Sequence, residues 1–255
     1  MGIEGSKLLP SHTSSRFNYF FRLINESQTL VIEDELNNNS KAKNFKLCNQ
    51  KNNSGATLLM FAAYNGNIEL LDALLKNGSD TSLRDNEGKT VLFYLINSKL
   101  ENRQKAVRIL LENKCPIDQT DFKLTTCLHE AVKANDTELV KILVEEDANV
   151  NLSDEDGISP LNRAVDNCNI EIVKLLLNKK INVNQIDKNG LTALHIASVQ
   201  NDVEIIKLLI NKGANINVKD NSMNTPLTLA KLIDSRDAII YLRKFGVREA
   251  KLKRY

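Results

Sequence analysis

Hydrophobic positions along this chain recur in blocks, and each block opens with a hydroxyl residue two positions before a leucine. Ser and Thr are preferred at helix N-caps, so each block predicts a short helix, a turn, a second helix and a polar hairpin. The six predicted caps, separated by 33, 36, 33, 33 and 33 residues, are Thr57, Thr90, Thr126, Ser159, Thr192 and Thr225. Six copies of one helical unit predict an all-α solenoid in which each repeat packs on its neighbours.

The fifth block shows the pattern most fully. After the cap at Thr192, the second helix is expected to end near Gly213, because glycine tolerates the left-handed conformation in which helices commonly end. Pro160 and Pro226 directly follow their caps, where the missing N–H costs nothing. The predicted buried stripe of the second helix contains Val203, Ile205, Ile206, Leu208 and Leu209.

These blocks resemble ankyrin repeats, whose pattern is approximately D-x-x-G-x-T-P-L-H-x-A-A-x-x-G-x-x-x-I/V-V-x-x-L-L-x-x-G-A-x-V-N. The resemblance covers about residues 52–247 and implies stacked helix-turn-helix units joined by hairpin loops. Only His129 and His195 keep the histidine of the pattern, and the resemblance implies that each ties a loop to a helix. Five residues before the caps stand Asn52, Asp85, Asp121, Asp154, Asp187 and Asp220, as the family's hairpin prefers.

The chain outside the repeats is expected to form a flexible tail over residues 1–16 and a degenerate capping repeat over residues 17–56. Apolar spacing predicts helices over 17–26 and 28–37 in that cap. Residues 38–54, rich in Asn and Lys, are expected to form a long hairpin loop or a partly disordered insertion. Six repeats then occupy 57–247, and a basic tail occupies 248–255.

The second repeat is three residues longer than the others, and the extra residues lie near 99–105, between its helices. A neutral loop insertion is one interpretation, and a feature specific to the partner is the other.

The first residues fit the N-myristoylation pattern M-G-x-x-x-[ST], with Gly2 as the acceptor. A single myristoyl chain gives only weak and reversible membrane attachment, which the basic C-terminal residues could strengthen at an anionic surface. The alternatives are a coincidental match or an artificial start of the chain.

Charge and cysteine usage narrow the function classes further. Lys and Arg number 34 against 32 Asp and Glu, so the net charge of +2 predicts no preference for nucleic acid. The four cysteines form no CxxC pair, and neither an apolar signal segment nor an apolar run of about 20 residues is present. A protein without a membrane span is expected, monomeric alone, in a reducing cytoplasmic or nuclear compartment, with peripheral membrane association if Gly2 is acylated.

No pattern of catalytic or ligand-binding residues stands out. The chain lacks GxGxxG and GxxxxGK[ST], so no phosphate-binding loop is predicted. Its three histidines, His12, His129 and His195, are too dispersed to supply one metal site. We therefore expect no catalytic residue, no metal and no cofactor, and a protein that is not an enzyme.

The resemblance implies binding of one or more partner proteins through hairpin tips and first helices. Tyr64 and Phe122 are the first candidates for hot spots, since aromatic side chains dominate interfaces when a partner desolvates them, and packing between repeats is their alternative role. The implied contact residues are Tyr64, Asn65, Glu87, Lys89, Phe122, Lys123, Lys133, Glu155, Asp156, Asp166, Lys188, Asn189 and Gln200. A scaffold or adaptor is the favoured interpretation. The alternatives are an inhibitor or assembly chaperone that occludes one partner's surface, and a host-directed effector.

Overall fold

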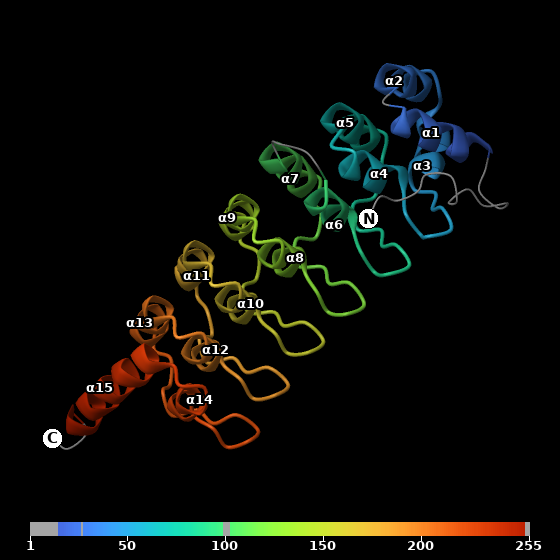
Figure 1. Ribbon diagram of the computed structural model, residues 1–255. Helices are drawn as coiled ribbons and strands as arrows, with labels where there is room; N and C mark the ends of the chain where they lie inside the picture. Colours follow the sequence, from blue (N-terminus) through green and yellow to red (C-terminus); the bar gives the residue numbers. More distant parts are fainter. Residues whose placement is uncertain (1–14, 27, 99–102, 253–255) are drawn as a thin grey trace. The chain divides into compact units, whose positions relative to one another are not determined.

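Two antiparallel helices and one hairpin make up the unit that repeats along the chain in the computed structural model, which describes residues 15–26, 28–98 and 103–252 (Figure 1). These residues form helices and turns without any β-strand, so the predicted all-α class is confirmed. The chain divides into residues 1–122 (unit 1) and 123–255 (unit 2). The Gly2 motif and residues 1–14 of the predicted flexible tail lie outside the described residues, as do residues 99–102 of the insertion.

Unit 1 consists of a helical cap followed by two ankyrin-like repeats, and the cap helices α1 and α2 pack on the helices of the first repeat. Phe17 and Phe20 of the first helix and Ile32 and Leu36 of the second are fully buried, which explains why this degenerate segment folds against the repeats. The first helices α4 and α6 lie side by side, and so do the second helices α5 and α7 (Figure 1). The helices of unit 1 are α1 (Ser15–Asn25), α2 (Thr29–Asn37), α3 (Lys41–Cys48), α4 (Leu58–Tyr64), α5 (Ile68–Lys76), α6 (Val91–Ile96) and α7 (Arg103–Glu112).

The loop predicted over residues 38–54 is wrong in its middle, because α3 forms there. Asn44 is buried and donates hydrogen bonds from Nδ2 to the Leu36 carbonyl at 2.6 Å and to Asn77 Oδ1 at 2.7 Å. Leu47 and Cys48 are buried behind it. An Asn- and Lys-rich sequence carries little helical periodicity, and these contacts with distant residues supply the stabilisation that the local pattern does not show.

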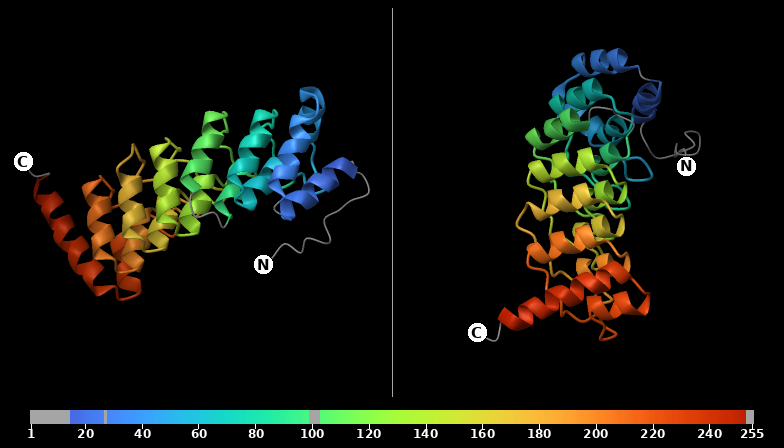
Figure 2. Two further views of the ribbon diagram at one scale, coloured as in Figure 1. Left: turned by 90° about the horizontal axis from the view of Figure 1, so that it is seen from above. Right: turned by 60° about the vertical axis from the view of Figure 1, so that its left-hand side comes forward.

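Unit 2 continues the same architecture through four repeats. Its first helices α8, α10, α12 and α14 form one row, and its second helices form another (Figure 2). The hairpins of this unit all extend to one side (Figure 1). The helices are α8 (Cys127–Lys133), α9 (Thr137–Glu145), α10 (Pro160–Asp166), α11 (Ile170–Leu177), α12 (Ala193–Val199), α13 (Val203–Asn211), α14 (Pro226–Leu232) and α15 (Arg236–Leu252).

The helix starts follow from capping chemistry. Thr57, Thr126, Ser159 and Thr225 each accept a hydrogen bond from the backbone N–H three residues later, as predicted, whereas the Thr90 side chain makes no such bond. Ten residues after the cap, a second set of side chains caps the second helices. These residues are Asn67, Asp136, Asn169 and Asp202. The pair of caps ten residues apart therefore sets where both helices of a repeat begin.

The buried stripe of α13 differs from the predicted one at three positions, Val203, Leu208 and Ile210. Leu208 and Val203 are only half-buried, and the side chains buried against the neighbouring helices are Ile205, Ile206, Leu209 and Ile210. Helix α13 contacts α11, α12 and α15, and these neighbours determine which of its apolar side chains are buried.

The basic tail predicted over residues 248–255 is also corrected, because α15 continues through Leu252. Gly246 stands 33 residues after Gly213 and corresponds to it in the repeat pattern. Gly213 has φ +93° and ends α13, whereas Gly246 lies within α15. A glycine permits a helix to end but does not compel it. Within the described ranges, no helix has both the length and the apolar character needed to cross a membrane.

Candidate protein-binding surface

In several repeats the hairpin is closed by the aspartate that precedes the cap by five residues. Asp85 Oδ1 accepts hydrogen bonds from the backbone N–H groups of Glu87 and Lys89, both at 2.8 Å. The Asp85 N–H in turn donates to the Lys89 carbonyl at 2.9 Å. The same pair of side-chain contacts recurs at Asp154, Asp187 and Asp220. The carboxylate thus satisfies the turn's donors and fixes its shape.

Neighbouring hairpins are joined edge to edge within each unit. In unit 1, the Asn86 N–H donates to the Ser54 carbonyl at 2.9 Å, and the Phe122 N–H donates to the Glu87 carbonyl at 3.0 Å. In unit 2, the Lys188 N–H donates to the Asp156 carbonyl at 2.9 Å. These backbone bonds hold successive tips at a fixed spacing, so a partner would meet a preorganised surface.

The two repeat histidines connect a first helix to the following hairpin. His129 Nδ1 accepts from the Thr126 N–H at 3.2 Å, and Nε2 lies 3.2 Å from the Ile158 carbonyl, so Nε2 carries the proton. His195 bonds to the Thr192 N–H and the Asn224 carbonyl, both at 3.1 Å. Burial lowers the pKa of both imidazoles, which therefore stay neutral. The contacts agree with the structural role that the family resemblance implies.

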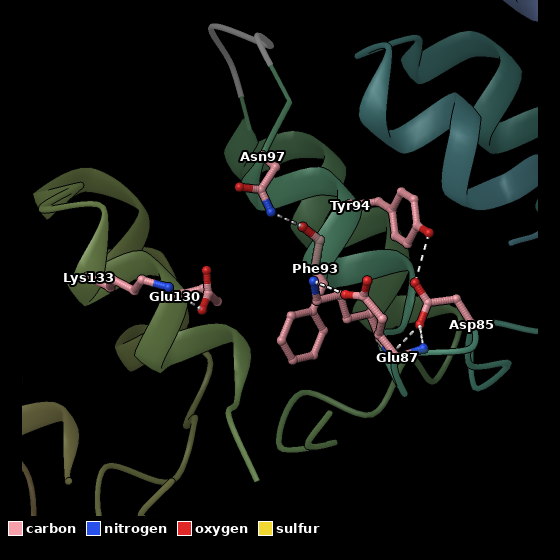
Figure 3. A network of polar contacts seen from close by, with 8 residues as sticks. Asp85, Glu87, Phe93, Tyr94, Asn97, Glu130 and Lys133 are labelled. Carbon is pink, nitrogen blue, oxygen red and sulfur yellow. Dashed lines mark hydrogen bonds and ion pairs between the residues drawn. The ribbon is translucent and has the colours of Figure 1, made fainter. Parts of the chain in front are cut away.

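A groove of about 530 Å³ lies in unit 1, between the first helices α4 and α6 and the hairpins that precede them. Figure 3 labels five of its lining residues, Asp85, Glu87, Phe93, Tyr94 and Asn97. Three of the predicted contact residues meet there, namely Tyr64, Glu87 and Lys89. We call this site the aromatic groove. Its complete lining is Ser54, Phe61, Tyr64, Asp85, Asn86, Glu87, Lys89, Phe93, Tyr94 and Asn97.

The floor of the aromatic groove is held by a small polar network. The Tyr94 hydroxyl donates to Asp85 Oδ2 at 2.8 Å, as Figure 3 shows. Burial, followed by this bond to a carboxylate, raises the pKa of Tyr94, so the phenol remains a donor at neutral pH. On the rim, the Lys89 ammonium lies 2.6 Å from Glu87 Oε2. The Asn97 amide donates to the Phe93 carbonyl at 2.9 Å.

The aromatic residues on the floor of the groove were not among the contact residues predicted from the sequence. Phe61 and Tyr94 stand four residues after the caps of repeats one and two, and their ring centroids are 6.4 Å apart. Phe93, three residues after its cap, is fully buried beneath them. An aromatic residue at the same register of two adjacent repeats is the signal that could have identified the floor.

Phe122 is 67% exposed at the tip of its hairpin. The Arg84 guanidinium lies over its ring, 5.0 Å from the centroid, and donates to the Thr120 carbonyl at 2.8 Å. Packing against other repeats therefore covers little of the ring. Tyr64 is half-buried in the aromatic groove, and Asn65 is exposed beside it in the sequence but does not line the groove.

The predicted contact residues of unit 2 do not form one site. Gln200, half-buried, lines a separate cavity of about 730 Å³ with Cys168 and Tyr241. Asp166, Lys188 and Asn189 are exposed and line neither that cavity nor the small one beside the second hairpin of the unit. That small hollow of about 210 Å³ brings together the remaining four, Lys123, Lys133, Glu155 and Asp156.

Ion pairs cover much of this unit 2 surface. Lys133 lies 3.3 Å from Glu130 (Figure 3), and Lys188 lies 3.1 Å from Asp156.

No group of three or more His, Cys, Asp or Glu side chains that could hold a metal ion occurs in the part of the chain that the structure describes.

Comparison with known families agrees with the geometry. A family model described as ankyrin repeats (3 copies) matches residues 28–121 and 115–187, and a second one, ankyrin repeats (many copies), matches residues 175–230. The chain belongs to the ankyrin-repeat family. Ankyrin repeats are protein–protein interaction modules, so the family assignment implies a protein partner.

One curated relative shares part of this sequence. It is phosphocholine transferase AnkX of Legionella pneumophila, which is 39% identical over 85 residues. The aligned part makes up 33% of this chain and 9% of AnkX, so the likeness concerns a small portion of that protein.

Proposed function

We propose that this chain is a non-enzymatic scaffold or adaptor that binds a partner protein through its hairpin tips and first helices. The observation that carries the proposal is the aromatic groove, where Tyr64, Glu87 and Lys89 come together at the place from which the family binds proteins. Grooves with an aromatic floor and a polar rim are typical of interface hot spots, because a partner side chain can be desolvated there.

The test is affinity capture with the full chain as bait, followed by measurement of binding to the captured protein. Tyr64→Ala and Phe122→Ala are each expected to weaken binding at least tenfold, or about 1.4 kcal/mol. Their effect on the melting temperature should be small, because Phe122 is largely exposed and Tyr64 is half-buried.

The matched controls are Lys141→Ala and Glu171→Ala, exposed positions on the second helices α9 and α11. Neither belongs to the proposed surface, so neither should alter affinity. Equal losses for the controls and for the Tyr64 and Phe122 variants would contradict binding through hairpin tips and first helices. A large fall in melting temperature for Phe122→Ala with unchanged affinity would instead assign that ring to packing.

An inhibitor or assembly chaperone that occludes its partner's surface is the alternative within the same binding mode. An adaptor is expected to form a ternary complex with a third component, whereas an inhibitor suppresses its partner's activity by itself. Reconstitution of the captured complex, with and without the chain, separates the two.

A host-directed effector is favoured by one specific observation, the 39% identity to a segment of AnkX from Legionella pneumophila. The effector interpretation predicts saturable binding to a protein from a eukaryotic host cell and none to proteins of the organism that encodes the chain. Parallel capture from both lysates, with Tyr64→Ala as the control bait, tests it.

We propose a mainly cytoplasmic location with nuclear or peripheral membrane association as alternatives. If Gly2 is myristoylated, intact-mass analysis of the chain made in eukaryotic cells will show the added acyl mass, and Gly2→Ala will abolish a minor membrane fraction. Absence of the acyl mass would end the membrane hypothesis.

A further inference from the structure

The aromatic groove of unit 1 combines ring surfaces with carboxylates in a way that selects among partner side chains. We propose that it receives an arginine side chain of the partner protein, an inference that rests on the proposed function. The guanidinium would stack on the half-buried rings of Tyr64 and Tyr94 and pair with the Glu87 carboxylate at the rim.

The first argument is the charge of the lining. Three charged side chains line the groove, the carboxylates of Asp85 and Glu87 and the ammonium of Lys89, which leaves one net negative charge. The faces of Phe and Tyr rings are also negative because of the ring quadrupole, so both features attract a cation and repel an anion. An acidic partner segment does not fit this lining.

The second argument concerns hydrogen bonds. An aliphatic side chain in the groove would displace water from Asp85, Glu87 and Lys89 without forming hydrogen bonds in its place. Desolvation of charged groups without compensating hydrogen bonds is energetically unfavourable. A guanidinium presents five N–H donors in one plane. Acceptors around the groove include the Tyr64 hydroxyl and the Glu87 carboxylate, of which Oε2 already lies beside the Lys89 ammonium.

The third argument separates arginine from lysine. Lys89 already places an ammonium 2.6 Å from Glu87 Oε2, so a second ammonium would compete for the same compact site. A carboxylate can accept a planar guanidinium through two parallel bonds, and the plane of that group can lie on an aromatic ring at the same time. The Glu87 side chain is 70% exposed, which leaves room for this approach.

Arg84 and Phe122 show the same pairing elsewhere in unit 1. There the guanidinium lies 5.0 Å from the ring centroid while its nitrogens donate to the carbonyls of Gly88 and Thr120, at 2.9 and 2.8 Å. The chain itself therefore uses an arginine that stacks on a ring and bonds to neighbouring oxygens, the combination that the aromatic groove offers to a partner.

The test uses random twelve-residue peptides displayed on phage, selected on the full chain after depletion on the Tyr64→Ala variant. Selected peptides are expected to share an arginine. In fluorescence anisotropy, replacing that arginine by citrulline, which keeps the shape and removes the charge, should raise Kd at least tenfold. Lysine in its place should bind more weakly than arginine. Loss of affinity with added salt should accompany the arginine peptides.

Two substitutions on the rim are expected to change the affinity for the arginine peptide differently. Glu87→Gln should weaken the arginine peptide about tenfold, whereas Lys89→Gln should leave it unchanged or strengthen it, because a competing cation is removed. Glu87 holds the neighbouring hairpin through its backbone carbonyl, so the side-chain change leaves that contact in place. Lys141→Gln, remote from the groove on α9, is the control and should have no effect.

Three outcomes would overturn the arginine assignment. The first is selection of peptides without a basic residue, or of no peptide at all. The second is equal binding of the citrulline peptide. The third is the reverse of the expected effects, with Glu87→Gln strengthening binding and Lys89→Gln weakening it. If the captured partner is sensitive to Tyr64→Ala but indifferent to Glu87→Gln, the arginine inference fails and the proposed function stands. If neither Tyr64→Ala nor Phe122→Ala changes the affinity for the partner, the proposed function itself fails.

Discussion

The Tyr94 hydroxyl donates a 2.8 Å hydrogen bond to Asp85 Oδ2, while the other oxygen of the same carboxylate accepts the N–H groups of Glu87 and Lys89. One aspartate thus connects helix α6 to the hairpin that precedes it. The aromatic floor and the charged rim of the groove are held by a single buried group, and a change at Tyr94 is expected to affect both.

Tyr94→Phe should lower the free energy of unfolding by about 1–2 kcal/mol, because it removes a hydrogen bond to a buried carboxylate and leaves that oxygen unsatisfied. Chemical denaturation followed by circular dichroism measures the change. Tyr64→Phe is the matched control and should stay within about 0.5 kcal/mol, since no described residue bonds to the Tyr64 hydroxyl. Equal effects of the two substitutions would mean that the Asp85 contact contributes nothing.

Leu209→Ala should cost about 2–5 kcal/mol of unfolding free energy, the range for truncation of a fully buried leucine. Leu208→Ala, one position earlier on α13, should cost clearly less because that side chain is only half-buried. Lys188→Ala at a hairpin tip should stay within about 0.5 kcal/mol. Urea denaturation of the three variants measures the order, and a larger loss at Leu208 than at Leu209 would refute the register of α13.

Leu124→Gly should stabilise the chain by up to about 1 kcal/mol. Leu124 has φ +58° at the hairpin position where Gly157 has φ +76°, and a side chain in the left-handed region costs about 1–2 kcal/mol, partly offset by the flexibility of glycine when unfolded. The reverse change, Gly157→Ala, should destabilise, because a Cβ there would lie 3.0 Å from the Asp187 Cα. Melting temperatures that move in the same direction for both variants would contradict this account.

Acidification from pH 7.5 to 5.5 should destabilise unit 2 through His129 and His195. Burial lowers the pKa of both, so the unfolded chain takes up protons first as the pH falls, and stability is full above the ordinary histidine pKa and declines below it. Each histidine contributes a slope of up to about 1.4 kcal/mol per pH unit.

One repeat of the chain carries asparagine in place of the histidine and suggests a control substitution for this pH dependence. Asn162 occupies the histidine position of its repeat, bonds to the Ser159 hydroxyl and donates to the Leu191 carbonyl at 3.4 Å. His129→Asn with His195→Asn should therefore flatten the melting temperature between pH 7.5 and 5.5. A double variant that keeps the full pH dependence would show that other groups titrate.

Much of the architecture was predictable because its causes are local. The caps from Thr57 to Thr225 and the prolines that follow two of them act within a few residues, so spacing alone located the repeats. The aspartates five residues upstream likewise close their own hairpins. Three of the predicted contact residues, Tyr64, Glu87 and Lys89, also proved to share one groove, since their register within the repeat determines on which side they lie.

Helix α3 depends on contacts between distant residues. The buried Asn44 amide N–H donates to Asn77, 33 positions away, and no window of sequence around residues 41–48 contains that partner. At Gly246 the sequence permits both a helix end and a continuing helix, and the structure adopts the second.

Periodicity also left the buried face of α13 and the depth of the groove undetermined. The sequence by itself determined the number of repeats, their caps and their hairpins, because hydrogen bonds over three to five residues specify these. Only the tertiary structure decided that Phe61, Phe93 and Tyr94 form one floor, with Asp85 bonded to Tyr94. Burial is a property of the stacked repeats, where each side chain is covered by residues about 33 positions away, and a pattern within one repeat does not contain that information.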